Sequence, residues 1–170
     1  HLAWEARRRG LYAAAICDFD VLHGLDEFHS AGRRLGLRNA AGFETRTFFP
    51  EYADQEINSP GEPGVFYFMG MGFAEEPDPD SNAGKLFTEM LDRAHRRNRA
   101  LVERINAQLD GLDLDYEADV LPLTPRGNAT ERHIVQAYHR QALAQTNHDP
   151  AAAADFWARQ PGLDQDAATE

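Results

Sequence analysis

Residues 11–20 read LYAAAICDFD, a short apolar run that ends in two carboxylates flanking a phenylalanine. The run has the composition of a buried strand, and amphipathic segments lie before it at residues 2–9 and after it at residues 25–35. A buried strand between helices is typical of an α/β sheet. Ligands of such sheets bind at the carboxyl ends of the strands, so Asp18 and Asp20 are the first candidates for chemistry.

Further strands and helices follow in the second and later parts of the chain. Residues 38–49 alternate between apolar and polar after Phe43, and an apolar run at 65–73 follows a stretch dense in turn formers, so two more strands are predicted. Apolar residues then recur at helical spacing from about Ser81 to Leu109. This order predicts an α/β part followed by a helical part.

The last third of the chain reads as helices. A short helix is expected over residues 115–121, and Asn128 with Glu131 has the pattern of a capping box that opens the next helix. A final helix starts at Asp149-Pro150. We therefore predict three parts, which are an α/β part at 1–80, a helical insertion at 81–158 and a flexible tail at 159–170.

Composition excludes several classes of function. The formal net charge of -11 argues against sequence-independent binding of nucleic acid, although a bound divalent metal could still admit a phosphorylated substrate. The single cysteine, Cys17, lies inside the apolar run and is predicted to be a small buried side chain. With no disulfide within the chain, no apolar span and no secretion signal, a cytoplasmic location without membrane association is expected. The oligomeric state stays open.

Three acidic residues are the strongest chemical candidates. Asp18 and Asp20 could bind a metal or act as nucleophile and acid, and the alternative is a helix cap with a turn carboxylate. Glu44 follows Gly42 in the second strand, and parallel pairing of the two strands would bring it towards Asp18. Acids that share a crevice need a cation or raised pKa values. The alternative for Glu44 is a structural ion pair with Arg46 or with another arginine.

Candidates for substrate binding are Arg46, Arg132 and His133. Arg132 and His133 follow the predicted cap of a late helix, and helix N-termini and arginine side chains both bind phosphate well. The alternative is an exposed arginine and an amphipathic histidine. His23 also stays a candidate because it is close to Asp18 in the sequence.

The run AICDFDVLHG at residues 15–24, followed by Glu27-Phe28 and by Gly42-Phe43-Glu44, resembles the PHP (polymerase and histidinol phosphatase) superfamily. Residues 67–70 and 131–134 extend the resemblance, which covers about residues 2–143. It implies a partial, distorted (β/α)7 barrel, with a helical insertion in its second half. It also implies a metal-dependent phosphoesterase, in which a hydroxide bound to zinc, manganese or iron attacks a phosphorylated small molecule or nucleotide. Glu44 matches a bridging metal ligand of that family.

The chain also departs from the family pattern. Phe19 and Tyr67 stand where the family places metal-binding histidines. The opening His-x-His pair would precede residue 1, and the closing His and Asp-x-His strands would follow residue 170, so we expect a piece of a longer protein. A metal-depleted binding or regulatory module is therefore an alternative to the enzyme.

A third hypothesis is a haloacid-dehalogenase-like phosphatase, with Asp18 as nucleophile and Asp20 as general acid. That family has glycine directly after the second aspartate and a later lysine. Here Val21-Leu22 follows, and the only later lysine is Lys85. This hypothesis ranks below the other two.

Overall fold

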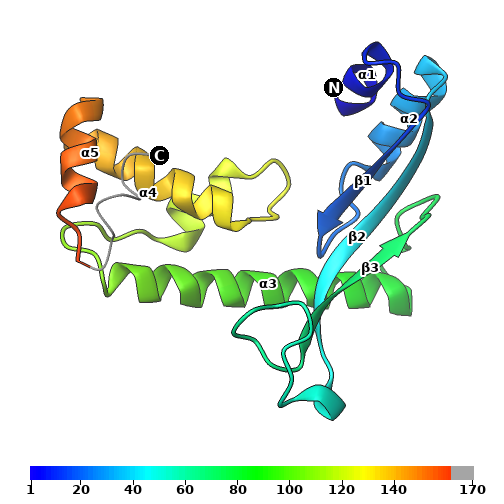
Figure 1. The fold of residues 1–170 in the computed structure, drawn as a ribbon. Helices are drawn as coiled ribbons and strands as arrows, with labels where there is room; N and C mark the ends of the chain where they lie inside the picture. The colour runs from blue at the N-terminus through cyan, green and yellow to red at the C-terminus, as the bar shows by residue number, and fades with distance from the viewer. Residues whose placement is uncertain (162–170) are drawn as a thin grey trace. The chain divides into compact units, whose positions relative to one another are not determined.

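The computed structural model describes residues 1–161 and divides into two compact units, His1–Asp92 and a second unit that begins at Arg93. The first unit contains α1 (Leu2–Arg8), α2 (Leu25–Leu35) and a three-stranded sheet (Figure 1). α2 ends as predicted at Gly36, whose left-handed backbone (φ 63°) suits glycine. The predicted α/β character of this part is confirmed.

The sheet has the strand order β1 (Ala13–Phe19), β2 (Arg38–Phe48) and β3 (Val65–Met71). β1 and β2 are parallel because α2 carries the chain back to the start of the next strand. β3 is antiparallel to β2, since the connection between them holds only the 3-10 turn η1 (Pro50–Tyr52) and no crossover helix (Figure 1). The described residues therefore form an open, mixed sheet and not a closed barrel.

Helices cover one face of this sheet. Ile16 of β1 packs with residues of α1 and α2, and Ala41 and Phe43 of β2 pack around the fully buried Leu25. Because successive residues of a strand point to opposite faces, the residues between them form the other face, here called the open face. The central residues of the open face are Cys17, Phe19, Gly42, Glu44, Met69 and Met71.

The open face corrects the prediction of a buried first strand. Cys17 is exposed, and in β1 only Ala14 and Ile16 are partly buried. The reason is that β1 is an edge strand with helices on one side only. Apolar residues elsewhere on the open face are exposed too, with Phe19 at 49%, Met69 at 59% and Met71 at 49%.

The long predicted helix is present as α3 (Asn82–Asn106), which continues from the first unit into the second. The predicted short helix is a π-helical turn, η2 (Tyr116–Val120), followed by the 3-10 turn η3 (Leu121–Leu123). Two further helices complete the second unit, α4 (Glu131–Gln145) and α5 (Pro150–Ala158). None of the described helices is both long and apolar enough to cross a membrane.

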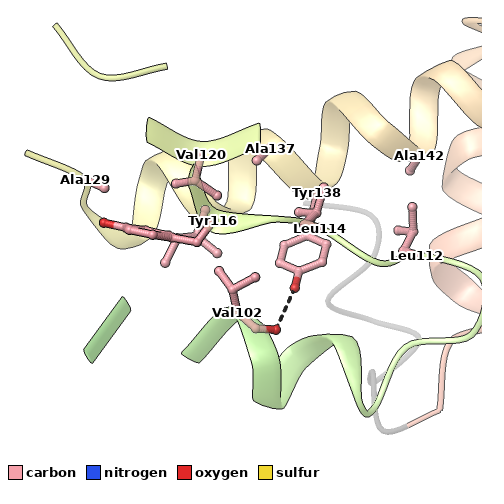
Figure 2. Close-up of a cluster of buried hydrophobic side chains, with 10 residues drawn as sticks. Val102, Leu112, Leu114, Tyr116, Val120, Ala129, Ala137, Tyr138 and Ala142 are labelled. Atoms are coloured by element: carbon pink, nitrogen blue, oxygen red, sulfur yellow. Dashed lines mark hydrogen bonds between the residues drawn. The ribbon is translucent and has the colours of Figure 1, made fainter. Parts of the chain in front are cut away.

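The second unit has its own apolar core (Figure 2). Val102 of α3, Val120 of η2 and Ile134 of α4 are almost completely buried there. The Tyr138 hydroxyl donates to the Val102 carbonyl at 3.1 Å, and burial raises the pKa of Tyr138 to about 12. The core also includes Leu112, Leu114, Tyr116, Ala129, Ala137, Tyr138 and Ala142.

The start of α4 corrects the predicted cap. The helix begins at Glu131 with Thr130 as its N-cap, so Asn128 is not the capping residue. The Thr130 backbone N–H donates to His133 Nδ1 at 3.1 Å. His133, at the third position of the helix, therefore takes the capping-box role that glutamate or glutamine usually has. Asp149 caps α5 as predicted.

The predicted tail starts with an ordered contact. Gln160 is buried, its Oε1 accepts from the Asp110 backbone N–H at 2.8 Å, and its Nε2 donates to the Asp110 carbonyl at 3.2 Å. The rest of that prediction, from residue 162, lies outside the described residues.

Leu25→Ala should lower the free energy of unfolding by about 2–5 kcal/mol, because it leaves a cavity in the core beneath the sheet. Leu86→Ala is the matched control, since Leu86 is 55% exposed and Leu25 is 0% exposed. Chemical denaturation followed by circular dichroism measures both, and equal losses would contradict the assigned core.

Candidate functional site

The register of β1 and β2 decides which of the predicted acids share a face. Phe19 pairs with Glu44, and Asp18 pairs with Phe43. Paired residues point to the same face, so Glu44 and Phe19 lie on the open face and Asp18 on the covered one. The strands are parallel neighbours, as the prediction required, but the structure does not bring Asp18 and Glu44 together.

Asp18 lies at the end of β1, near His23. Partial loss of hydration raises the pKa of the Asp18 carboxyl. The electrostatic effect of the nearby His23 ring acts in the opposite direction and is smaller. His23 is therefore an electrostatic neighbour of Asp18, as its place in the sequence suggested.

Asp20 is held inside the structure. It is 7% exposed and has a left-handed backbone with φ 61°. Its N–H donates to the Glu44 carbonyl at 2.8 Å, and its Oδ1 accepts from Thr45 Oγ1 at 2.6 Å. A buried carboxylate bonded in this way does not favour the role of proton donor to a substrate.

Sulfur and apolar groups flank Glu44 across the strands on the open face. Phe19 and Met69 are its neighbours in register, and Cys17 lies one row away along β1. Loss of hydration, and secondarily the charges of Glu44 and Asp18, raise the pKa of the Cys17 thiol. Cys17 therefore belongs to the surroundings of Glu44.

Gly42 explains the closeness of β2 and β3 beside Glu44. A Cβ atom at this position would lie 2.2 Å from the Gly70 carbonyl oxygen and 2.3 Å from the Met71 sulfur. Only glycine leaves room for this approach, as expected from its position two residues before Glu44. Met71 thus lies against the β2 backbone.

The predicted substrate-binding residues are in three different settings. Arg46 forms an ion pair with Glu62, the acidic partner that the sequence did not indicate. Arg132 is exposed in the first turn of α4 in the second unit, and His133 is engaged in the cap of the same helix. Arg46 shares the open face with Glu44, because it lies two residues further along β2, whereas Arg132 and His133 belong to the second unit.

The open face fits a metal centre only in part. A carboxylate and a thiol, from Glu44 and Cys17, are both groups that bind zinc. Phe19, directly beside Glu44, offers no donor atom. Among residues 1–161 no cluster of three or more His, Cys, Asp or Glu could hold a metal ion. These residues alone do not complete a metal centre, and no catalytic step can be assigned to one.

Comparison with known proteins shows which solved structures share the fold of this chain. No family model and no curated protein sequence matches the chain. A "putative metal-dependent phosphoesterase" from Bifidobacterium adolescentis shares 22% identity, with a TM-score of 0.59 over 96% of this chain and 50% of that one. The chain has the fold of half such a protein.

A second solved structure agrees. It is an amidohydrolase from Chromobacterium violaceum, determined with bound sulfate and no metal, at 15% identity and a TM-score of 0.54. The match covers 97% of this chain and 51% of the amidohydrolase. The chain thus spans about half the length of both structures.

Sequence reasoning missed the sulfur groups around Glu44 and the role of Thr45. Met69 and Met71 are ordinary strand residues in the sequence, and only the register of β2 with β3 places them near Glu44. Thr45 follows Glu44 in the sequence, but only the fold brings its hydroxyl to Asp20. The place of Cys17 could have been predicted from the sequence, because strand residues alternate between faces and Cys17 and Phe19 are two positions apart in β1.

Glu44→Gln should speed alkylation of Cys17. Removing the carboxylate charge lowers the raised pKa of the thiol, and more thiolate is then present at a given pH below that pKa. Iodoacetamide labelling followed by mass spectrometry across a pH series measures this. Glu27→Gln, which removes an exposed acid from α2, is the control and should leave the rate unchanged. An unchanged rate in Glu44→Gln would place Glu44 away from Cys17.

Proposed function

We propose that this chain forms one half of a metal-dependent phosphoesterase and that Glu44 is the carboxylate it contributes to the metal centre. The observation that carries the proposal is the place of Glu44 on the open face, in register with position 19. The likeness in fold to half of a "putative metal-dependent phosphoesterase" supports it. The other metal ligands would come from parts of a longer protein that lie outside these 170 residues.

The proposed substrate is a phosphorylated small molecule or nucleotide, and the proposed metals are zinc, manganese or iron. When bound, such ions promote phosphoester hydrolysis by neutralising charge on the phosphate. The chain's own part is to hold Glu44 in a fixed position on a strand that is paired on both sides. Arg132 is exposed in the first turn of α4, where helix backbone N–H groups and a guanidinium both favour an anion.

A second candidate function is a binding module that has lost the metal centre. Phe19 favours it, because an aromatic ring stands directly beside Glu44. Met69 and Met71 extend the apolar and sulfur-rich character of the same face. Metal content of the full-length protein separates the two candidates, since the module would hold none.

In the full-length protein, Glu44→Gln should lower metal-supported phosphoesterase activity by about 100-fold or more. Loss of a residue that only hydrogen-bonds a metal ligand already costs about 10–100-fold, and Glu44 is proposed to be a ligand itself. Hydrolysis of bis(p-nitrophenyl) phosphate with added Mn²⁺ measures the activity, and circular dichroism verifies the fold. Glu27→Gln serves again as the exposed control. Full activity and metal content in Glu44→Gln would overturn the proposal.

Phe19→His should raise the zinc content of the 170-residue chain, because a histidine in register with Glu44 and near Cys17 adds a third donor on the open face. Metal analysis after dialysis gives the stoichiometry. Phe48→His is the matched control, since Phe48 lies on the same face four residues beyond Glu44. Equal zinc in the two variants would show that position 19 does not face the Glu44 carboxylate.

A further inference from the structure

We infer that Asp20 is a positioning residue for Glu44, acting through the backbone of β2 and the hydroxyl of Thr45. This inference rests on the proposed function for its chemical meaning, but its geometry is independent of any metal. It assigns Asp20 a role that does not require contact with substrate.

The need for such a residue comes from the place where β1 ends. β1 pairs with β2 only as far as Phe19 and Glu44, and beyond this row β2 continues beside β3 alone. Glu44 is thus the last residue of β2 held in register from both sides. Without a further bond, the side of β2 that faces β1 would lack a partner directly after the residue that presents the carboxylate.

Asp20 supplies two bonds at this point. Its N–H donates to the Glu44 carbonyl at 2.8 Å, which is the last backbone bond of the parallel pairing and closes the row of Phe19 and Glu44. Its Oδ1 accepts from Thr45 Oγ1 at 2.6 Å. The two bonds hold the peptide unit that joins Glu44 to Thr45 from one side.

The side chain of Thr45 then fixes the direction of Glu44. Successive residues of a strand point to opposite faces, so holding Thr45 on the side of Asp20 keeps Glu44 on the open face. A one-residue slip of β2 would exchange the two faces, and the bond between Asp20 and Thr45 opposes it.

The backbone of Asp20 is adapted to this role. Its φ of 61° lies in the left-handed region, which turns the chain back so that the carboxylate and the N–H reach the same segment of β2. Aspartate, asparagine and glycine adopt this conformation more readily than other residues. The side chain is 7% exposed, in agreement with a structural bond and not with access to substrate.

The conformation allows matched variants. Asp20→Asn keeps the left-handed backbone and an acceptor oxygen, whereas Asp20→Gly keeps the backbone and removes the acceptor. Thr45→Ser keeps the hydroxyl donor, and Thr45→Val removes it with little change in shape. Asp20→Asn and Thr45→Ser should behave like the parent chain, and Asp20→Gly and Thr45→Val should share one defect.

The first readout is the orientation of Glu44 by NMR on the 170-residue chain. Nuclear Overhauser contacts from the Glu44 side chain to Phe19 and Met69 should persist in the two conservative variants and weaken in Asp20→Gly and Thr45→Val. The double variant Asp20→Gly/Thr45→Val should be no worse than either single change, because both remove the same bond. Unchanged contacts in Asp20→Gly and Thr45→Val would overturn the inference.

The second readout uses the full-length protein with Mn²⁺ alone as the probe, through broadening of the Glu44 amide signal. Asp20→Gly and Thr45→Val should weaken the apparent affinity about 10-fold or more, the lower end of the range seen when groups that orient a metal ligand are lost. Lower stability with unchanged Mn²⁺ affinity would reduce Asp20 to a merely structural residue and overturn the inference. If Glu44→Gln does not alter the broadening, the proposed function fails, and the NMR contacts alone then decide the role of Asp20.

Discussion

The parallel pairing of β1 with β2, with Phe19 beside Glu44, is the constraint on which the rest of the first unit depends. This register sends Ile16, Ala41 and Phe43 into the core beneath the helices. It sends Cys17 and Glu44 to the opposite face. Because strand residues alternate strictly, a shift by one position would bury the carboxylate and expose the core.

The two faces of the sheet differ in the residues they carry and in what they contact. The covered face supplies stability through aliphatic and aromatic contacts, among them the edge-to-face packing of Phe43 on Phe87 at 5.0 Å between ring centroids. The open face carries the carboxylate, the thiol and two thioethers, with exposed apolar area around them. A sheet with one apolar face left exposed is typical of a surface that meets other parts of a protein, which agrees with a fold that matches half of larger structures.

The second unit is stabilised by a core in which buried polar groups have partners. Asn98 donates to the Ala129 carbonyl at 2.8 Å, and the single proton of the Tyr138 hydroxyl is shared between the Val102 carbonyl and Asn106 Oδ1, the latter at 2.6 Å. These bonds connect α3 to the irregular segment and to α4, so the π-helical and 3-10 turns between the helices are held without long regular elements. The charged predicted residue of this unit, Arg132, remains at its surface.

The sequence by itself determined the order of strands and helices and the turn at Gly36, and it indicated a close backbone approach at Gly42, because these follow from local periodicity and backbone freedom. The parallel pairing of β1 with β2 was only a condition of the sequence argument, and the structure supplied it. It could not determine which acids share a face. Asp18 and Asp20 look equivalent in sequence, yet one lies beside His23 and the other is bonded to Thr45. Only the tertiary structure separated them, because strand register and the left-handed turn at Asp20 depend on contacts with residues 24 or more positions away along the chain.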